Sequence, residues 1–444
     1  MNSMKTVADV VRWRLCVGCG ACAWVCPEHR VRLVDFPAEG IRPALEGGDC
    51  ATCDQCLRVC PMVETDFGRL QKPWESVAGV GAEWGSVLEI WEGHASDPGV
   101  RFKGASGGAL TALSAYCLEV LGIRGVLQTG QDPENAIRNR TRLSQSREEL
   151  MVATGSRYSP GSVCNGLHLI EAATGPCAIV GRPVEAAALR NAQRVRPELD
   201  RNVGVVFSFF CAESPSTRGT IDLLKKLDLD PARVESLRYR GEGWPGHFAA
   251  VLKGEPDPAA KIPYHESWSF LQAYRPWAAH LWPDSTGELA DIACGDPWYM
   301  APDGENPGVS LVVVRTERGR EMLRGAMEQG YLELKRAEPW KLIKSQEGHI
   351  GKKGAVWGRL LVMRLFGLPV PRFHSSRLFA CWRRLSFEEK ARSTLGTLRR
   401  IISRKLYHPL MLDPGSGVLV QPAMAAGPER KAGDNLTNIH LRKS

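Results

Sequence analysis

The sequence predicts two parts of different fold class, a short cysteine-rich α+β module followed by a longer α/β body. The first observation is the uneven distribution of 14 cysteines, eight of which fall between Cys16 and Cys60. The second is the alternation of short apolar runs with helical patterns from about residue 74 onward, which is typical of α/β folds. A length of 444 residues, 43% hydrophobic and 24% charged, favours a globular chain of two or three domains.

The cysteine-rich module contains two cysteine runs of the same spacing, 34 residues apart. The first run is Cys16, Cys19, Cys22 and Cys26, followed by Pro27, and the second is Cys50, Cys53, Cys56 and Cys60, followed by Pro61. Three close cysteines and a fourth before proline are typical of bacterial ferredoxins, in which the fourth cysteine ligates the other cluster. We therefore predict two [4Fe–4S] clusters, one held by Cys16, Cys19, Cys22 and Cys60, the other by Cys50, Cys53, Cys56 and Cys26.

Residues around these cysteines fit the same chemistry. Gly18 and Gly20 let backbone amides approach the cluster sulfurs, and such hydrogen bonds help to set the reduction potential. Between the runs, residues 31–36 and 41–45 predict a hairpin that turns at Glu39 and Gly40. A pair of zinc sites is the alternative, but zinc prefers two separated Cys-x2-Cys pairs, so the spacing favours iron.

The body of the chain alternates predicted strands and helices. Short apolar runs predict buried strands at residues 125–129, 177–180, 203–209 and 309–314. Helical patterns lie between or beside them, at residues 109–121, 184–194, 216–227 and 318–329. This alternation predicts an α/β body.

The segment before the first of these helices, residues 101–108, reads RFKGASGG. Glycines at a helix start allow close backbone approach, and the free amides there favour an anion such as a phosphate. The candidates for binding it are Arg101, Lys103, Ser106, Gly107 and Gly108. A capped helix start that needs small residues explains the segment about as well. The scattered histidines show no metal-ligand spacing.

Several motifs in order resemble the β-subunit family of coenzyme F-420 hydrogenases and dehydrogenases, over roughly residues 12–405. After the cysteine repeat, residues 102–113 (FKGASGGALTAL) resemble the family's Ser-Gly-Gly helix start. Residues 175–179 (GPCAI) resemble its Gly-x-Pro-Cys turn, shortened by one residue. Residues 210–216 (FCAESPS), 239–246 (YRGEGWPG) and 290–298 (ADIACGDPW) are similar to its later blocks.

The resemblance implies an iron–sulfur flavoprotein with FAD near the Ser-Gly-Gly helix start, and adds Gly175, Pro176 and Cys177 as cofactor-binding candidates. It implies an oxidoreductase in which electrons pass between a ferredoxin or other redox partner, the two clusters and FAD. Hydride would then be exchanged with coenzyme F-420 or another organic substrate. Because a cluster carries one electron and a hydride carries two, a flavin is needed between them. The alternatives are a non-catalytic electron-transfer subunit of a larger complex and a flavin-free structural protein of a polysaccharide-assembly pathway; no catalytic residue is assigned.

One block departs from the family pattern. Many relatives carry Cys-x2-Cys-Pro-Asp before the last block, whereas residues 279–284 read AHLWPD here, so we do not expect a third cluster. Trp282 is interpreted as a core residue first and a ring-packing residue second. The single thiols Cys177, Cys211 and Cys294 are either small buried hydrophobes or neighbours of the flavin. Asp296 is interpreted as a turn former before a catalytic acid.

These features divide the chain into a ferredoxin-like domain (1–72), two parts of a flavin-binding body (73–200 and 201–350), a basic helical region (351–411) and a flexible tail (412–444). Residues 335–405 carry 18 Lys and Arg against four acidic residues, in a chain of net charge +8. This excess suits an acidic redox partner, a polyanionic cofactor or a membrane surface, or it is a solvated face. No recognition motif accompanies it, so nucleic acid is not expected.

Residues 354–366 predict a basic, apolar helix. It is either an interfacial helix on a membrane surface or a helix packed on the body with Arg359 and Arg364 pointing outward. Residues 1–15 lack the continuous apolar stretch of a signal peptide, and no apolar run approaches the roughly 20 residues that span a bilayer. We therefore expect a cytoplasmic location.

Overall fold

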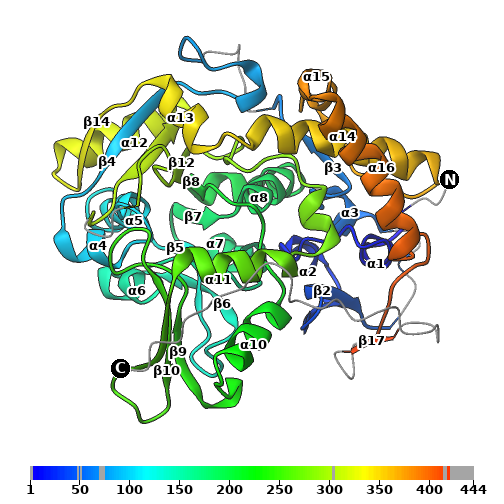
Figure 1. Ribbon diagram of the computed structural model, residues 1–444. Coiled ribbons are helices and arrows are strands. Elements are labelled where there is room, and N and C mark those ends of the chain that lie inside the picture. Colours follow the sequence, from blue (N-terminus) through cyan, green and yellow to red (C-terminus); the bar gives the residue numbers. More distant parts are fainter. Residues whose placement is uncertain are drawn as a thin grey trace.

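The computed structural model describes residues 4–47, 50, 53–69, 76–302, 306–413 and 418–420. Its centre is a mixed sheet of eight strands in the order β14-β4-β13-β12-β8-β7-β5-β6 (Figure 1). Neighbours among β5, β7, β8 and β12 run parallel, and the outer strands pair antiparallel. The strands are β4 (Glu89–Ala95), β5 (Val126–Gln131), β6 (Asn139–Ser144), β7 (Cys177–Gly181), β8 (Val203–Phe209), β12 (Ile292–Gly295), β13 (Ser310–Val314) and β14 (Leu332–Arg336).

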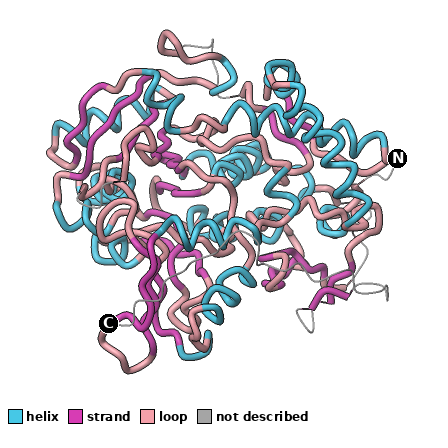
Figure 2. Tube along the Cα trace, viewed as in Figure 1, coloured by secondary structure: helices cyan, strands magenta, loops and turns pink. Residues whose placement is uncertain are grey.

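Helices cover both faces of this sheet, as Figures 1 and 2 show. On one face α5 (Ala109–Glu119) and α12 (Glu317–Glu328) pack against alternate strand residues such as Val205 and Val312. On the other face α7 (Leu167–Glu171), α8 (Pro183–Val195) and α9 (Pro197–Asn202) pack against residues such as Ile179 and Val206. Burial on both faces explains why these strands read as continuous apolar runs.

The strands and helices predicted for the body are all present. The predicted strands correspond to β5, β7, β8 and β13, and the predicted helices to α5, α8, α10 (Thr217–Lys226) and α12. Strands from the predicted parts 73–200 and 201–350 join in one sheet, because β8 pairs with β7 and β13 pairs with β4. Further helices at the edges are α4 (Pro98–Lys103), α6 (Arg147–Val152) and α13 (Pro339–Ser345).

A second, smaller sheet lies beside the body. It has the order β11-β10-β9 and is antiparallel, with strands β9 (Val234–Arg238), β10 (His247–Leu252) and β11 (Pro258–Pro263). Together with α10 and α11 (Tyr264–Leu271) it forms its own apolar core, in which Tyr239 and Phe248 are fully buried. This core places Arg240 and Tyr264 at the border with the large sheet.

The N-terminal module packs against the same sheet face as α8. It contains α1 (Val7–Arg12), α2 (Ala21–Val25), α3 (Gln55–Arg58), the hairpin strands β1 (Val31–Phe36) and β2 (Gly40–Leu45), and β3 (Glu64–Asp66). The predicted hairpin is confirmed, with Phe36 opposite Gly40. Trp24 and Val25 of α2 share an apolar core with Leu189 of α8, so the cysteine loops are held directly on the body.

The basic C-terminal region lies on the side of the N-terminal module (Figure 1). It consists of α14 (His349–Leu365), α15 (Leu378–Arg384) and α16 (Phe387–Ser403), with β15 (Arg372–His374) pairing parallel to β3. Strands β16 (Met411–Asp413) and β17 (Val418–Val420) follow, and most of the predicted tail, 412–444, lies outside the described residues. None of the helices in the described ranges combines the length and hydrophobicity that crossing a membrane requires.

Helix α14 packs on the body, as the second interpretation of residues 354–366 expected. Arg364 is exposed, but Arg359 points inward, where its Nη1 donates to the carbonyl oxygen of His280 at 2.6 Å. Burial lowers the pKa of Arg359 to about 10. The expectation that both arginines point outward is therefore wrong for Arg359, because this side chain caps a main-chain oxygen of the body.

Candidate functional site

The first cysteine loop has the local geometry that the glycine pattern predicted. Gly18 and Gly20 both adopt positive φ angles, 73° and 87°, and Gly20 begins α2. The amide of Gly18 donates to Cys16 Sγ at 3.3 Å. A Cβ atom on Gly18 would lie 2.6 Å from the carbonyl oxygen of Ile41, so only glycine fits between the loop and the hairpin.

Cysteines of the two runs lie near one another. Burial raises the pKa of Cys22, and the neighbouring thiols of Cys19, Cys16, Cys60 and Cys56 raise it further. Burial also raises the pKa of Cys56, to which Cys53, Cys50 and Cys26 add. Cys60 therefore lies near the first run and Cys26 near the second, an arrangement compatible with the predicted crossed ligation. Among the described residues, no three His, Cys, Asp or Glu side chains converge on a single-ion position.

A cavity of about 570 Å³ lies in the body, at the carboxyl ends of the parallel strands. Val180 and Gly181 of β7, Phe209 of β8 and Cys294 of β12 line it, together with the start of α5. Ligands of open α/β sheets bind at this edge, because the strand ends leave a crevice between their loops. Its volume lies within the roughly 300–1,000 Å³ usual for small-molecule pockets.

The Ser-Gly-Gly helix start reaches this cavity only in part. Ser106 and Gly108 line it, and Gly108 begins α5 with a φ of 73°. Gly107 instead packs on the sheet, where its amide donates to Ser310 Oγ at 2.9 Å. Arg101 and Lys103 do not line the cavity; Arg101 Nε donates to the carbonyl oxygen of Gly308 at 2.9 Å, and Lys103 is exposed.

The second candidate block lies at the other end of β7. Gly175 and Pro176 precede this strand and Cys177 begins it, whereas the cavity lies at its carboxyl end. Cys177 is fully buried, and its thiol lies 3.8 Å from the carbonyl oxygen of Gly175. The structure therefore does not bring this block together with Ser106 and Gly108. Of the single thiols, Cys211 and Cys294 do line the cavity.

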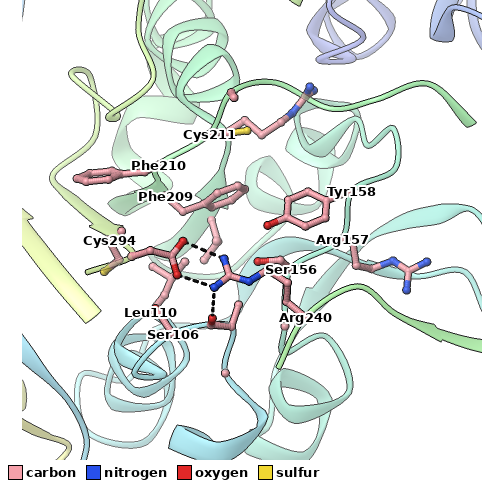
Figure 3. A pocket seen from close by; sticks show the side chains of 18 of the residues that line it. Ser106, Leu110, Ser156, Arg157, Tyr158, Phe209, Phe210, Cys211, Arg240 and Cys294 are labelled. Carbon is pink, nitrogen blue, oxygen red and sulfur yellow. Dashed lines mark hydrogen bonds and ion pairs between the residues drawn. The ribbon is translucent and has the colours of Figure 1, made fainter. Parts of the chain in front are cut away.

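Arg240 and Asp296 both line the cavity, and Figure 3 shows Arg240 among the lining side chains. The guanidinium donates to both carboxylate oxygens, at 2.8 Å and 2.7 Å, and also to the carbonyl oxygen of Ala105 at 2.7 Å. Burial opposes the charge of Arg240, but Asp296 outweighs it and raises the pKa of Arg240. The aromatic ring of Tyr264 lies 4.4 Å from this guanidinium, and Trp244 Nε1 donates to Asp296 at 3.1 Å. Asp296 is thus an ion-pair partner rather than a free acid.

Arg182 occupies the wall between the cavity and the first cysteine loop. Its Nη2 donates to the carbonyl oxygens of Val17 and Gly161, at 3.4 Å and 3.1 Å, and to Glu185 at 3.0 Å. Its Nη1 donates to Glu213 at 3.0 Å. A small hollow of about 20 Å³ on the far side of this wall is lined by Cys16 and Val17 and shares Arg182 and Glu213 with the cavity. The hollow beside Cys16 and the cavity thus have these two side chains in common.

Trp282 does not line the cavity. Trp282 is fully buried and packs against Phe67 and Phe373, with ring centroids 5.7 Å and 5.6 Å apart, which confirms its interpretation as a core residue.

The sequence did not lead us to predict three residues that line the cavity, Arg182, Arg240 and Lys352. Arg182 comes two residues after the predicted strand at 177–180, and Arg240 lies in residues 239–246, which resemble a block of the family. Both residues therefore had a signal in the sequence, whereas Lys352 had none.

Comparison with known proteins gives three matching family models. Residues 15–63 match the 4Fe-4S dicluster domain. Residues 90–168 match the N-terminal model and residues 176–339 the C-terminal model of the coenzyme F420 hydrogenase/dehydrogenase beta subunit, more than half of the chain together. The chain thus carries a 4Fe–4S dicluster domain, and the zinc alternative for the cysteine runs is not supported.

Individual relatives are similar to this chain over the same regions. The coenzyme F420 hydrogenase subunit beta of Methanococcus voltae is 26% identical over 294 residues, 65% of this chain and 99% of that protein. The F420-dependent formate dehydrogenase 1 subunit beta of Methanococcus maripaludis is 27% identical over 256 residues, 56% and 62% of the two chains. A chain of the F420-reducing [NiFe] hydrogenase complex from Methanosarcina barkeri has the same fold, with a TM-score of 0.51, 21% identity and coverage of 63% and 95%.

Proposed function

Because the chain belongs to the coenzyme F420 hydrogenase/dehydrogenase beta-subunit family, we propose that it is an iron–sulfur flavoprotein oxidoreductase. It passes electrons between a redox partner, two [4Fe–4S] clusters and FAD, and exchanges hydride with coenzyme F420 or another organic substrate. A bound flavin supplies the conversion between the one-electron chemistry of clusters and the two-electron chemistry of a hydride.

The observation that carries this proposal is the position of the first cysteine group. Cys16 and the cavity share one wall, which consists of Arg182, Glu213 and the main chain around Gly161. Gly18 and Cys19 are also held on the body, because Ser162 Oγ donates to the Gly18 carbonyl oxygen at 2.6 Å and the Cys164 amide donates to that of Cys19 at 3.1 Å. A cluster on this loop is thus fixed directly beside the cavity.

The residues of the cavity fit a flavin in three respects. Its volume of about 570 Å³ suits a cofactor-sized ligand. Ser106 and Gly108 stand at the start of α5, a helix of 11 residues whose N-terminal amides favour phosphate. Tyr158, Phe209 and Tyr264 provide aromatic surface for a ring, and Figure 3 shows Tyr158 and Phe209 beside Arg240.

The protein's own groups in the cavity would orient a bound flavin and exclude water from it. The Arg240–Asp296 pair lines the cavity and satisfies both charges internally, so neither needs solvent. Cys211 and Cys294 place two thiols at the strand ends, and burial raises the pKa of each to about 12. Both thiols are therefore protonated at neutral pH, and they can act only as weak hydrogen-bond donors or as packing groups.

The experiment is anaerobic purification of the full chain with iron, sulfide and flavin measured on one sample. We expect about eight irons per chain, the content of two [4Fe–4S] clusters, and about one FAD. Cluster iron without flavin would contradict hydride exchange and favour either a non-catalytic electron-transfer subunit or a structural protein. Reduction of the bound flavin by F420 in its reduced form would identify the hydride partner.

A further inference from the structure

Two consecutive lysines in the first turns of α14 have different surroundings. Lys353 Nζ donates to Glu288 Oε1 at 2.6 Å and to the carbonyl oxygen of Glu83 at 2.7 Å. Lys352 Nζ is buried, lines the cavity and has no hydrogen-bond partner in the described part of the chain. A buried ammonium near a helix start is disfavoured by lost hydration and by the positive end of the helix dipole. The buried ammonium of Lys352 is therefore open to an electron-rich group in the cavity.

The other cations that line the cavity are satisfied by the protein. Arg182 pairs with Glu185 and Glu213, and Arg240 pairs with Asp296. Arg157 donates to main-chain oxygens, those of Ala136 at 2.7 Å and Leu237 at 2.9 Å. Among the described residues, Lys352 is thus the cation of this cavity whose charged nitrogen has no hydrogen-bond partner.

Glu213 presents an open acceptor in the same cavity. Its Oε2 accepts from Arg182, but its Oε1 is buried without a partner among the described residues. The residue adopts a φ of 73°, a left-handed conformation that costs about 1 kcal/mol or more outside glycine and is common at ligand sites. Burial lowers the pKa of Lys352 and raises that of Glu213, and each charge opposes the shift of the other. Both side chains line the same cavity.

The end of the cavity at Glu213 is the one nearest the first cysteine group, because Glu213 lines both the cavity and the hollow beside Cys16. A redox ring at this end has the shortest path to a cluster on that loop. Lys352 lies beyond residue 339, where the C-terminal family model ends, so the model does not cover this residue.

We propose that Lys352 and Glu213 bind the polar edge of the flavin ring, Lys352 donating to a ring carbonyl and Glu213 accepting from a ring N–H. This inference rests on the proposed function. Uptake of two electrons and one proton adds one negative charge to such a ring, and a nearby cation favours the reduced form. Lys352 therefore raises the reduction potential of the bound flavin, and Glu213 contributes to its affinity.

The test compares flavin midpoint potentials of full-length variants by spectroelectrochemical titration. In Lys352→Met we expect the reduced flavin to bind about tenfold less tightly relative to the oxidised flavin, a potential lower by about 30 mV for two electrons. Lys352→Arg keeps the charge and should change this ratio less than twofold. Lys225→Met is the matched control, because Lys225 is exposed on α10 and does not line the cavity. Glu213→Gln should raise the Kd for FAD about tenfold.

The outcomes separate this inference from the proposal on which it rests. A Lys352→Met protein that binds flavin at the wild-type potential would overturn the role of Lys352 and leave the proposed function intact. A wild-type chain without flavin would remove both. If Lys352→Met does not fold, Lys352→Gln, which keeps a donor but no charge, is measured in its place with the same expected shift.

Discussion

Arg182 and Glu213 form a buried ion pair, 3.0 Å from Nη1 to the carboxylate, in the wall between the first cysteine loop and the cavity. The other end of the same guanidinium donates to the carbonyl oxygen of Val17, the residue after Cys16. Its charge is compensated again by Glu185 at 3.0 Å. One side chain therefore joins the cysteine loop to a carboxylate that lines the cavity, and the fold depends on its charge.

Replacing Arg182 by Met should destabilise the chain strongly. Glu185 and Glu213 would be left buried without a compensating charge, and breaking a buried pair in this way costs about 3–5 kcal/mol. Denaturant unfolding of the full chain measures this loss. Arg147→Gln is the control, because Arg147 forms exposed pairs with Asp97 and Glu119 that are worth only about 0–1 kcal/mol. Equal losses of unfolding free energy in the two variants would show that water reaches the Arg182 ion pairs.

If the ligation is crossed as we predict, each substitution of a fourth cysteine removes the cluster of the other run. Cys60→Ala should abolish the cluster held with Cys16, Cys19 and Cys22 and lower the iron content by about four per chain. Cys26→Ala should remove the other cluster by the same amount. Iron quantitation and electron paramagnetic resonance of the reduced proteins measure both effects.

The control for these variants is Cys117→Ala, since Cys117 is buried in the body beside Met322. It should keep all iron. If the residual spectrum of Cys60→Ala matches that of Cys53→Ala rather than that of Cys19→Ala, the ligands are not crossed between the runs.

Much of the fold could be predicted because its signals are local. The hairpin of β1 and β2 and the strands β7 and β8 follow from turn residues and apolar runs within a few positions. The order of the eight strands could not be predicted, because pairings such as β4 with β13 join segments about 220 residues apart. The patterns of single segments do not encode these contacts.

The residues of the candidate site likewise divide into those with a local sequence signal and those that long-range packing brings to the site. Ser106 and Gly108 were predicted from a motif and line the cavity, whereas Cys177 was implied by a resemblance and lies at the wrong end of β7. The rule that ligands bind at the carboxyl ends of parallel strands favours Arg182 over Cys177 once the strand is known. Lys352 comes from a helix that only tertiary packing brings to the cavity.

Gly107 offers a test of the helix start. A Cβ atom there would lie 2.6 Å from the carbonyl oxygen of Gly93 and from the amide nitrogen of Ser310. Since both are backbone atoms of the sheet, Gly107→Ala should lower the free energy of unfolding by about 1–3 kcal/mol and reduce FAD retention. Denaturant unfolding and flavin content measure the two effects.

The matched control is Gly396→Ala, in the interior of α16, where the nearest atoms to a Cβ lie 3.6 Å or more away. This substitution should stabilise the chain by about 0.5–1 kcal/mol, because alanine loses less backbone entropy in a helix. Opposite signs for the same chemical change would show that Gly107 is required by packing. A neutral Gly107→Ala would mean that α5 can shift away from β13.

The last prediction concerns acid stability. Burial and then the positive charges of Arg275, Arg359 and Arg400 lower the pKa of His280 to about 3. In the unfolded chain a histidine takes up a proton near pH 6.5, so only the unfolded state binds it between these values. The contribution of His280 is therefore complete above pH 6.5 and is lost as the pH falls toward 3.

The loss follows a slope of up to about 1.4 kcal/mol per pH unit for one proton. His280→Gln, which cannot take up a proton, should lose about 2 kcal/mol less than the wild type between pH 6.5 and 5, since the wild-type slope acts over this interval. Urea unfolding at the two pH values measures the difference, with the exposed His265→Gln as the control for general acid effects. Identical pH dependence in the wild type and His280→Gln would mean that His280 is protonated in the folded chain, and that the arginines around it are more hydrated than their burial indicates.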